Sequence, residues 1–314
     1  MNWLTKIKVL GDKIKKDIKK KFPSKSDIEN SNWTALNCCA GGPKLKSELF
    51  ENLMVCPNCS THHYVNPTER FNMHFGENNW EEIKTPLPID DPLGGWVDTK
   101  PYKARLKEAR KKTGQPCAVL SCKTKIDGIE IVASAIDFRF IGGSIASAEG
   151  ENILQAVQTA IDLNCSYILF SASGGMRMME SSVSLAQMTR MTIAISSLKK
   201  NKLPFINVFC HPTAGGTSAS ISSLSDIAMA EKGATIAFSG KRVIQATIKE
   251  PLPANFQKAE WVQEHGFCDI ILERKDIPKT LHSLLSILLK INTEVKLENL
   301  NETSELISET REAS

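Results

Sequence analysis

The chain has 314 residues, of which 41% are hydrophobic and 24% are charged, and its formal net charge is +4. This composition is ordinary for a globular protein and excludes a strong general attraction to polyanions. The sequence lacks an apolar run of the roughly 18 residues that a membrane helix needs, and its lysine-rich start lacks the apolar segment of a secretory signal.

Residues 1–32 are predicted to form a basic helix followed by a linker. Nine lysines and two aspartates fall within residues 1–25, and apolar residues recur among them near helical spacing. This pattern favours a solvated or partner-docked helix over an arm that binds a membrane or nucleic acid. Residues 33–66 then form a small module with four of the nine cysteines. The other five lie singly in apolar segments, which is typical of reduced thiols in a cytoplasmic protein.

Residues 67–295 alternate between predicted helices and strands. Two β-rich runs flank the turn Asp127-Gly128, which predicts a hairpin. Further buried strands are predicted at 166–171, 204–210, 227–230 and 234–238, and helices near 101–112, 153–161, 181–198 and from residue 217. This alternation predicts parallel βαβ units, so the fold class is α/β. Residues 296–314 lack apolar periodicity and are predicted to be an acidic, disordered tail.

Two glycine pairs occupy matching places in this α/β segment. Gly174-Gly175 follows the strand at 166–171, and Gly215-Gly216 follows the strand at 204–210. Ligands of open α/β sheets collect at the carboxyl ends of strands, where glycine lets backbone N–H groups approach a substrate. A single pair would indicate a tight turn, but two pairs in equivalent positions favour an oxyanion hole.

Other glycine-loop chemistries do not fit the spacing of these residues. Neither loop has the G-x4-G-K-[ST] pattern of a P-loop or the G-x-G-x-x-G pattern of a dinucleotide fold. The sequence has no G-x-S-x-G elbow for a serine nucleophile, and a base such as His211 cannot be assigned from the sequence. The loops are therefore predicted to act through backbone N–H groups.

Longer motifs include both glycine pairs and also occur elsewhere along the chain, each of them once. They are Met1-Asn2-Trp3, Glu48-Leu49-Phe50-Glu51-Asn52-Leu53, Phe140-Ile141-Gly142-Gly143-Ser144, the segment Ser171 to Met178, the segment Pro212 to Ser220, and the segment Phe238 to Ile244. From residue 1 to about residue 292, the sequence resembles the carboxyltransferase beta-subunit family of bacterial acetyl-CoA carboxylase.

The resemblance implies a crotonase-like (ClpP/crotonase) ββα spiral domain at 67–295, with a small zinc-ribbon-like module at 33–66. It implies transfer of a carboxyl group from carboxybiotin, on a biotin carboxyl carrier protein, to acetyl-CoA. The product would be malonyl-CoA for fatty acid biosynthesis. The implied partners are a carboxyltransferase alpha subunit, in an alpha2-beta2 assembly, the carrier protein and biotin carboxylase. The active site would lie between alpha and beta chains, so this chain would be inactive alone.

The resemblance also assigns roles to the glycines by matched position. It implies that Gly174 and Gly175 are the main oxyanion donors. Gly215 and Gly216 would be additional donors or pocket backbone. In this chemistry backbone N–H groups stabilise a thioester enolate, and the biotin ureido group itself takes the proton.

The same resemblance implies substrate-binding residues around the loops. Gly142, Gly143 and Ser144 would shape the acyl-CoA site. Arg177 and Arg242 would contact a substrate phosphate or the alpha subunit. For each arginine, a structural salt bridge or a solvated position is the alternative.

The cysteine module departs from the family pattern of two C-x2-C knuckles. Only the second knuckle, Cys56 to Cys59, is intact, because Cys38 and Cys39 are adjacent. Adjacent cysteines rarely both reach one tetrahedral ion without strain. Zinc could still be bound by Cys39, Cys56 and Cys59, together with Cys38 or with His62 or His63. The alternative is a degenerate ribbon held by packing, with no metal.

Two other functions remain open at this point. A carboxyltransferase or decarboxylase acting on another acyl-CoA would share the chemistry, although such relatives commonly fuse both spiral domains and usually lack the ribbon. A nucleic-acid-binding regulatory protein could use the basic N-terminus and the ribbon. Its lysines, however, lack interleaved aromatic residues, and the rest of the chain is not basic.

Overall fold

The computed structural model describes residues 33–34, 36, 38–39 and 42–290. The helix and linker predicted at 1–32 and the tail predicted at 296–314 lie outside these residues. The strands are β1 (Trp33–Thr34), β2 (Lys44–Leu45), β3 (Trp80–Glu82), β4 (Val119–Ile126), β5 (Ile129–Ile136), β6 (Ser166–Ser173), β7 (Phe205–Thr213), β8 (Ile227–Glu231) and β9 (Ile270–Leu272). The α-helices are α3 (Lys46–Glu51), α4 (Pro67–Phe75), α5 (Tyr102–Thr113), α6 (Ser147–Asp162), α7 (Ser181–Lys200), α8 (Gly215–Ala219), α9 (Lys241–Ile248), α10 (Ala259–Glu264) and α11 (Ile277–Leu288).

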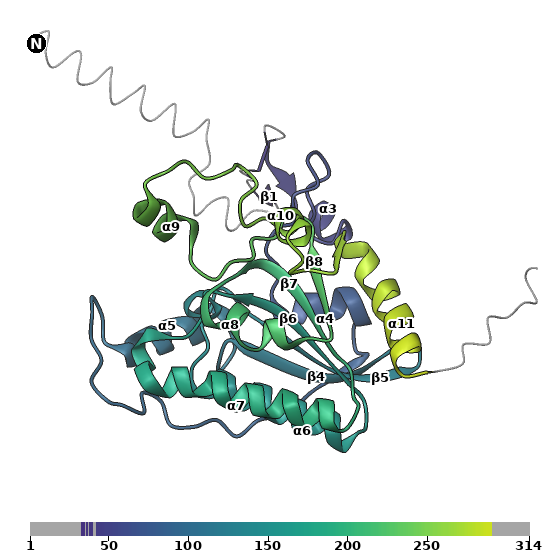
Figure 1. The fold of residues 1–314 in the computed structure, drawn as a ribbon, viewed down its shortest axis with the longest axis horizontal. Coiled ribbons are helices and arrows are strands. Elements are labelled where there is room, and N and C mark those ends of the chain that lie inside the picture. Colours follow the sequence, from purple (N-terminus) through teal and green to yellow (C-terminus); the bar gives the residue numbers. More distant parts are fainter. Residues whose placement is uncertain (1–32, 35, 37, 40–41, 291–314) are drawn as a thin grey trace, which may run out of the picture.

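Most of the described chain is organised around one seven-stranded sheet with the order β3-β4-β5-β6-β7-β8-β9 (Figure 1). Strands β3, β4 and β5 are antiparallel neighbours, and β5 to β9 run parallel. The hairpin predicted around Asp127-Gly128 is confirmed, since both residues have positive φ (45° and 87°) and join β4 to β5. Two such residues match the right-handed twist of the strands they connect.

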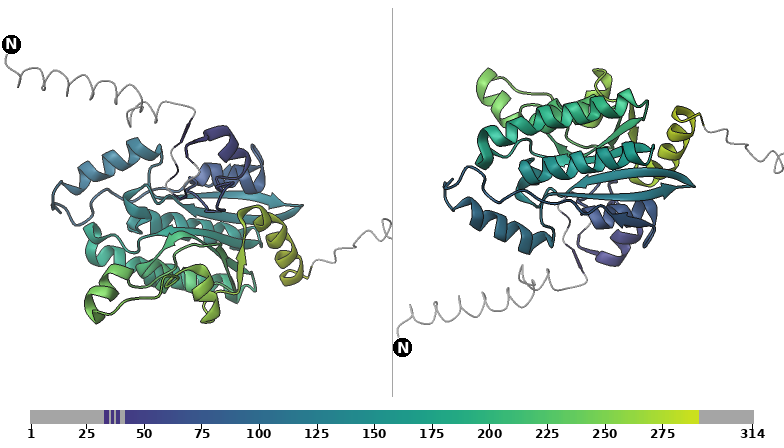
Figure 2. Two further views of the ribbon diagram at one scale, coloured as in Figure 1. Left: turned by 90° about the horizontal axis from the view of Figure 1, so that it is seen from above. Right: turned by 90° about the horizontal axis from the view of Figure 1, so that it is seen from below.

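Hydrophobic cores cover both faces of the sheet, which explains why its central strands β5, β6 and β7 are buried along most of their length. On one face, α6 and α7 lie side by side (Figure 2), and they pack with α5 against residues such as Val132 and Leu169. On the other face, Phe71 of α4 and Leu281 of α11 pack against Ile131 and neighbouring strand residues. Every residue of β6 is buried as a result.

Besides the bonds within the sheet, a few backbone hydrogen bonds join the segments at and beyond the carboxyl ends of β6 and β7. The Ala214 N–H donates to the carbonyl of Ser173 (2.7 Å), and the Ala237 N–H donates to the carbonyl of Thr213 (3.0 Å). Isolated bridges pair Ile145 with Met176 and Thr213 with Ile236. Successive strand–loop segments are therefore hydrogen-bonded twice, once within the sheet and once beyond its carboxyl edge.

Two local predictions from the sequence need correction. The apolar side chains at 234–238 predict a strand, but this segment makes only isolated bridges, because its backbone pairs with the neighbouring loops beyond the sheet. The helix expected from residue 217 is α8, which begins earlier, at Gly215, and has only five residues. The second glycine pair thus lies within the first turn of a helix.

The cysteine module is attached to the end of the sheet by a buried charge network. Arg274 donates to the carbonyls of Leu53 (2.7 Å) and His63 (3.1 Å), and it also pairs with Glu231 at the end of β8 (2.8 Å). Arg70 of α4 pairs with the same carboxylate at 2.8 Å. Among the described residues, no helix is both long and apolar enough to cross a membrane.

Candidate active site

The loops that follow β6 and β7 lie against each other at the carboxyl edge of the sheet. Gly175 has a φ of 111°. A Cβ atom placed on Gly175 would lie 3.1 Å from the amide nitrogen of Gly216 and 3.2 Å from the Cα of Gly215. Side chains here would force the two backbones apart, so the glycines allow the close contact. The predicted placement of both pairs after successive parallel strands is confirmed.

A third loop, formed by residues 140–145, completes this group. The carbonyl of Gly142 accepts a hydrogen bond from the Gly174 N–H (2.8 Å), and the carbonyl of Gly175 accepts one from the Ile145 N–H (2.9 Å). Gly143 packs directly against the backbone carbonyl of Ala172. The predicted residues at 142–144 therefore lie beside the first glycine pair.

The four predicted glycine donors differ in whether their N–H groups are free. The N–H of Gly174 is bonded to Gly142, that of Gly175 to the Ser173 hydroxyl (3.1 Å), and that of Gly215 to the Phe238 carbonyl (3.0 Å). Gly216 is the second residue of α8, and none of the described residues accepts a hydrogen bond from its N–H. N–H groups in a first helical turn have no partner within the helix. Gly216 is therefore the uncommitted donor of the four.

Some residues that shape these loops were not identified from the sequence. The Ser173 hydroxyl lies 2.8 Å from the Thr217 hydroxyl and so joins the two loops through side chains. Met176 and Met188 pack beside Gly216, where an added Cβ would lie 2.7 Å from the Cγ of Met176. Their sequence signal is weak, because serine, threonine and methionine are common in loops and helices of every kind.

Arg177 has its guanidinium inside the protein rather than at a substrate-facing surface. The residue is 2% exposed, and its Nη2 lies 2.6 Å from Glu149 and 2.7 Å from the carbonyl of Ser144. Its Nε donates to the Ser144 hydroxyl at 3.1 Å. These contacts favour the structural salt bridge over a phosphate contact. The side chain of Arg242 lies outside the described part of the chain.

An apolar cavity of about 560 Å3 borders α8. Its lining includes Ala219 of α8, Ala237, Phe238, Trp261 and Phe267. Phe238 and Phe267 are 70% and 75% exposed, so part of this apolar lining faces solvent in the isolated chain. Polar residues also line the cavity, namely Ser218, Ser223, Ser225, Gln257 and Asp269. A mainly apolar cavity with some polar groups suits a ligand that has an apolar part.

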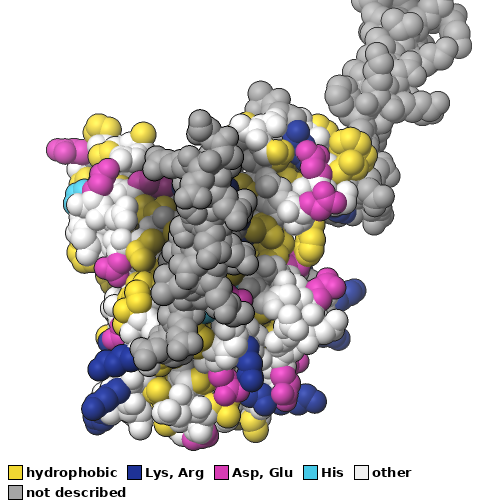
Figure 3. Space-filling view, turned by 90° about the vertical axis from the view of Figure 1, so that its right-hand side faces the viewer, with side chains coloured by type: hydrophobic (Ala, Val, Ile, Leu, Met, Phe, Trp, Pro, Cys, Tyr) yellow, Lys and Arg dark blue, Asp and Glu magenta, His cyan; other side chains and the backbone are white. Residues whose placement is uncertain are grey.

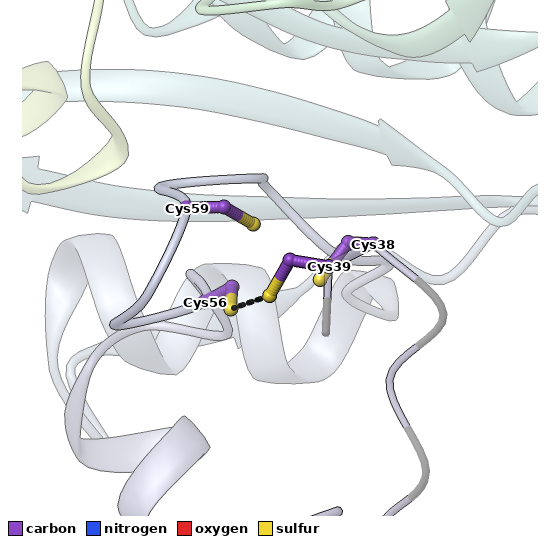
Figure 4. Close-up of side chains that lie close together, drawn as sticks. All are labelled: Cys38, Cys39, Cys56 and Cys59. Carbon is purple, nitrogen blue, oxygen red and sulfur yellow. Dashed lines mark hydrogen bonds between the residues drawn. The ribbon is translucent and has the colours of Figure 1, made fainter. Parts of the chain in front are cut away.

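The four cysteines of the N-terminal module form one compact group (Figure 4). The sulfur atoms of Cys38, Cys39, Cys56 and Cys59 all lie within 4.8 Å of one another, and those of Cys39 and Cys56 are 3.8 Å apart. Tetrahedral zinc with Zn–S bonds of about 2.3 Å requires sulfur separations of about 3.8 Å. This group could therefore hold a metal ion, even though two of its cysteines are adjacent in sequence.

Cys38, rather than a histidine, is the fourth residue of this group. Neither His62 nor His63 is in the cysteine group. The Nε2 of His62 instead lies 2.9 Å from Glu273. Hydrogen bonds from the side chain and backbone of Thr61 lower the pKa of Cys59 to about 6, whereas burial and hydrogen bonds with the other cysteines raise the pKa of Cys38 to about 12. In this arrangement Cys59 is the cysteine of the two that most readily forms the thiolate that a metal binds.

The face shown in Figure 3 bears on the nucleic-acid alternative. Lysine and arginine side chains occur there together with aspartate and glutamate side chains, rather than as one basic patch. A nucleic-acid surface would concentrate positive charge. The described part of this face gives no support to that function.

Comparisons with known proteins agree with this geometry. Residues 97–300 match the Carboxyl transferase domain family. An acetyl-coenzyme A carboxylase carboxyl transferase subunit beta from Pelagibacter ubique (strain HTCC1062) is 52% identical over 97% of this chain and 97% of its own length. The protein of that name from Beijerinckia indica subsp. indica is 40% identical over 92% of this chain and 96% of its own length.

Solved structures share the fold at lower identity. A transcarboxylase 12S structure with methylmalonyl-coenzyme A and methylmalonic acid bound has a TM-score of 0.56 and 22% identity, covering 70% of this chain and 41% of that chain. A Pseudomonas malonate decarboxylase hetero-dimer has a TM-score of 0.54 and 19% identity, covering 71% of this chain and 86% of that chain. At these identities the likeness concerns the fold alone.

Proposed function

The chain belongs to the carboxyl transferase family, as a beta subunit of acetyl-CoA carboxylase carboxyltransferase with a crotonase-like α/β fold, and from this premise we propose that its glycine loops stabilise the enolate of acetyl-CoA. The enzyme is a transferase of fatty acid biosynthesis. It moves a carboxyl group from carboxybiotin to acetyl-CoA and forms malonyl-CoA.

The free N–H of Gly216 is the observation that carries this proposal. Removing a proton from the methyl group of acetyl-CoA places negative charge on the thioester oxygen. A fixed backbone donor stabilises that charge more than it stabilises the neutral thioester, which lowers the barrier. The apolar cavity beside α8 supports an acyl-CoA as the ligand.

The roles of the other glycines follow from their hydrogen bonds. The N–H groups of Gly174 and Gly215 link different loops, and that of Gly175 bonds within its own loop to Ser173; together these bonds fix the loops around Gly216. Gly142 has no described atom within 4 Å of an added Cβ, so its surface is open to a substrate. Carboxybiotin supplies the activated carboxyl group. No described side chain of the loops is needed as a general base.

The site is proposed to be completed by a second chain, the alpha subunit of an alpha2-beta2 assembly. The carrier protein and biotin carboxylase would be the other partners, and the cytoplasm the location. The same proposal divides the chain into four segments. These are a basic helix and linker at 1–32, a cysteine module at 33–66, a catalytic domain at 67–295 and a tail at 296–314. Support for the second chain comes from exposed apolar residues near the cavity, including Phe238 and Phe267.

Activity is expected only when this chain is co-expressed with a carboxyltransferase alpha subunit. The assay is malonyl-CoA-dependent carboxylation of free biotin, which is the reverse reaction. The purified chain alone should give no more than the background rate, and the complex should be active. Activity of the chain alone would show that one chain completes the site, and an inactive complex with intact assembly would count against the assigned reaction.

We further propose that the cysteine group binds one zinc ion. Protein purified without added zinc is expected to contain about one equivalent, and Cys56→Ser should lower the content strongly, because it removes one of four ligands. Cys268→Ser is the matched control, since Cys268 is buried elsewhere in the domain. Metal analysis by mass spectrometry makes the measurement. Less than a tenth of an equivalent in the unaltered protein would favour a ribbon without metal.

A further inference from the structure

A second buried charge network lies beneath the glycine loops. Arg177 pairs with Glu149, and it also donates to the Tyr102 hydroxyl at 3.1 Å. The Tyr102 hydroxyl in turn donates to Glu180 at 2.6 Å. All four side chains are at most 3% exposed. They come from α5, α6 and the segment between β6 and α7, so the network joins elements that are far apart in sequence.

The guanidinium of Arg177 spans two of the three loops of the site. It belongs to the loop that carries Gly174 and Gly175, and two of its nitrogens bond to Ser144 in the loop at 140–145. Backbone bonds link the same two loops, since the Arg177 N–H donates to the Ile145 carbonyl at 2.8 Å. The Arg177 side chain thus adds two hydrogen bonds to the backbone bonds between these two loops, and we call this set of side-chain contacts the clamp.

The carboxylate of Glu149 connects this clamp to the start of α6. One of its oxygens accepts the N–H of Ala118 (2.9 Å) as well as Arg177, and the other accepts the N–H of Ala146 (3.0 Å) at the helix N-cap. Glu180 accepts the N–H of Ser147 at 2.9 Å. Four of the five N–H donors of Arg177 are bonded within the chain, and the residue is 2% exposed, so the clamp is placed to hold the loops rather than to contact a substrate.

We infer that Arg177 is a positioning residue for the carboxyl transfer: its clamp on Ser144 holds the loop of Gly174 and Gly175 in place, and thereby sets Gly175 against Gly216. This inference rests on the proposed role of Gly216 as the oxyanion donor. The contact between Gly175 and Gly216 is tight enough that a shift of one loop moves the other. Small displacements of a fixed donor affect the transition state more than the bound substrate.

The test is Arg177→Lys in the complex with the alpha subunit. Lysine keeps the positive charge but cannot donate to Ser144, Tyr102 and Glu149 with the geometry of a planar guanidinium. We expect kcat to fall by about 10- to 100-fold, while KM for malonyl-CoA changes by less than about twofold. Tyr102→Phe, which removes one hydroxyl from the network and keeps the ring, should lower kcat by a smaller factor in the same direction.

Two matched controls separate positioning from loss of stability. Arg274→Lys alters another buried arginine, also 1–2% exposed and paired with a buried glutamate, but outside the loops. Arg190→Lys alters an exposed arginine that pairs with Glu151 at 2.7 Å between the same helices α6 and α7. Both should keep kcat near that of the unaltered complex, although Arg274→Lys should unfold more easily.

Each outcome decides for or against the inference. An unchanged kcat for Arg177→Lys, or an equal loss of kcat in Arg274→Lys at matched stability, would overturn it. A raised KM with unchanged kcat would instead identify Arg177 as a substrate contact. An inactive unaltered complex would contradict the proposed function rather than the positioning role.

Discussion

Gly175→Ala is expected to reduce kcat for malonyl-CoA-dependent biotin carboxylation by at least about 100-fold, which is the loss seen when an oxyanion donor is displaced. Its Cβ would lie 3.1 Å from the Gly216 nitrogen and 3.2 Å from the Gly215 Cα, so the added methyl group would push the two loops apart. Because both contacts are with backbone atoms, no side chain can move aside. The measurement is steady-state kinetics of the complex with the alpha subunit.

The matched control for this prediction is Gly114→Ala. Gly114 also has a positive φ, of 73°, but no described atom lies within 4 Å of its added Cβ, and it ends α5 away from the loops. An L-residue in its αL conformation (φ 73°, ψ 2°) carries about 1–2 kcal/mol of strain, so this variant tests a positive φ without the contact to Gly216. If Gly175→Ala kept normal kcat in an intact complex, or if Gly114→Ala lost as much, the loops would not form the oxyanion site.

Glu231→Gln is expected to lower the free energy of unfolding by about 3–5 kcal/mol. Glu231 is 1% exposed and pairs with both Arg70 and Arg274 at 2.8 Å. Removing its charge leaves two buried guanidinium groups without their shared counter-ion. Urea unfolding of the purified chain, followed by circular dichroism, gives the magnitude. A loss below about 1 kcal/mol would show that the network is hydrated enough to tolerate the unpaired charges.

The same variant should change how stability depends on pH. Burial alone would raise the pKa of Glu231, but the charges of Arg70 and Arg274 and the hydrogen bonds from Arg274 hold it well below its usual range. The ionised carboxylate therefore stabilises the fold above its unfolded pKa of about 4.3, and this contribution is lost as the pH falls through the lower folded-state value. Glu231→Gln should lack this part of the acid destabilisation.

Glu273→Gln provides the control for the Glu231 prediction. Glu273 precedes Arg274 in sequence and pairs with His62 of the cysteine module and with Lys232, but its side chain is 30% exposed. Its loss should cost about 1 kcal/mol or less, because water screens an exposed pair. Limited proteolysis should cut the module at residues 46–66 faster in Glu231→Gln, since Arg274 anchors it through Leu53 and His63.

Local patterns predicted the fold well where short-range chemistry decides it. The turn at Asp127-Gly128 fixed the β4–β5 hairpin because both residues accept positive φ. Apolar runs identified β6 and β7, because strands covered on both faces are buried along most of their length and so are rich in apolar residues. The segment at 234–238 has the same apolar character, yet its backbone pairs only locally beyond the sheet. Composition alone could not distinguish these two environments.

The cysteine group likewise was predicted in part from the sequence and completed only by the tertiary structure. Sequence spacing selected Cys56 and Cys59 and left the fourth ligand open among Cys38, His62 and His63. Only the fold turns Cys38 toward the other sulfur atoms and directs His62 to Glu273 instead. The orientation of these two side chains depends on contacts between residues that are distant in sequence, and the spacing of cysteines does not predict such contacts.

The sequence by itself determined the α/β class and the placement of both glycine pairs at strand ends, because periodicity and the position of glycine are local properties. The resemblance to the family came from its long motifs in their fixed order. The tertiary structure decided which groups are free to act. Three of the four glycine N–H groups are bonded to partners in other loops or to Ser173, which leaves Gly216, and Arg177 is enclosed by Glu149, Ser144 and Tyr102. Whether a donor is available depends on what the folded chain brings beside it, and those partners lie up to 75 residues away in sequence.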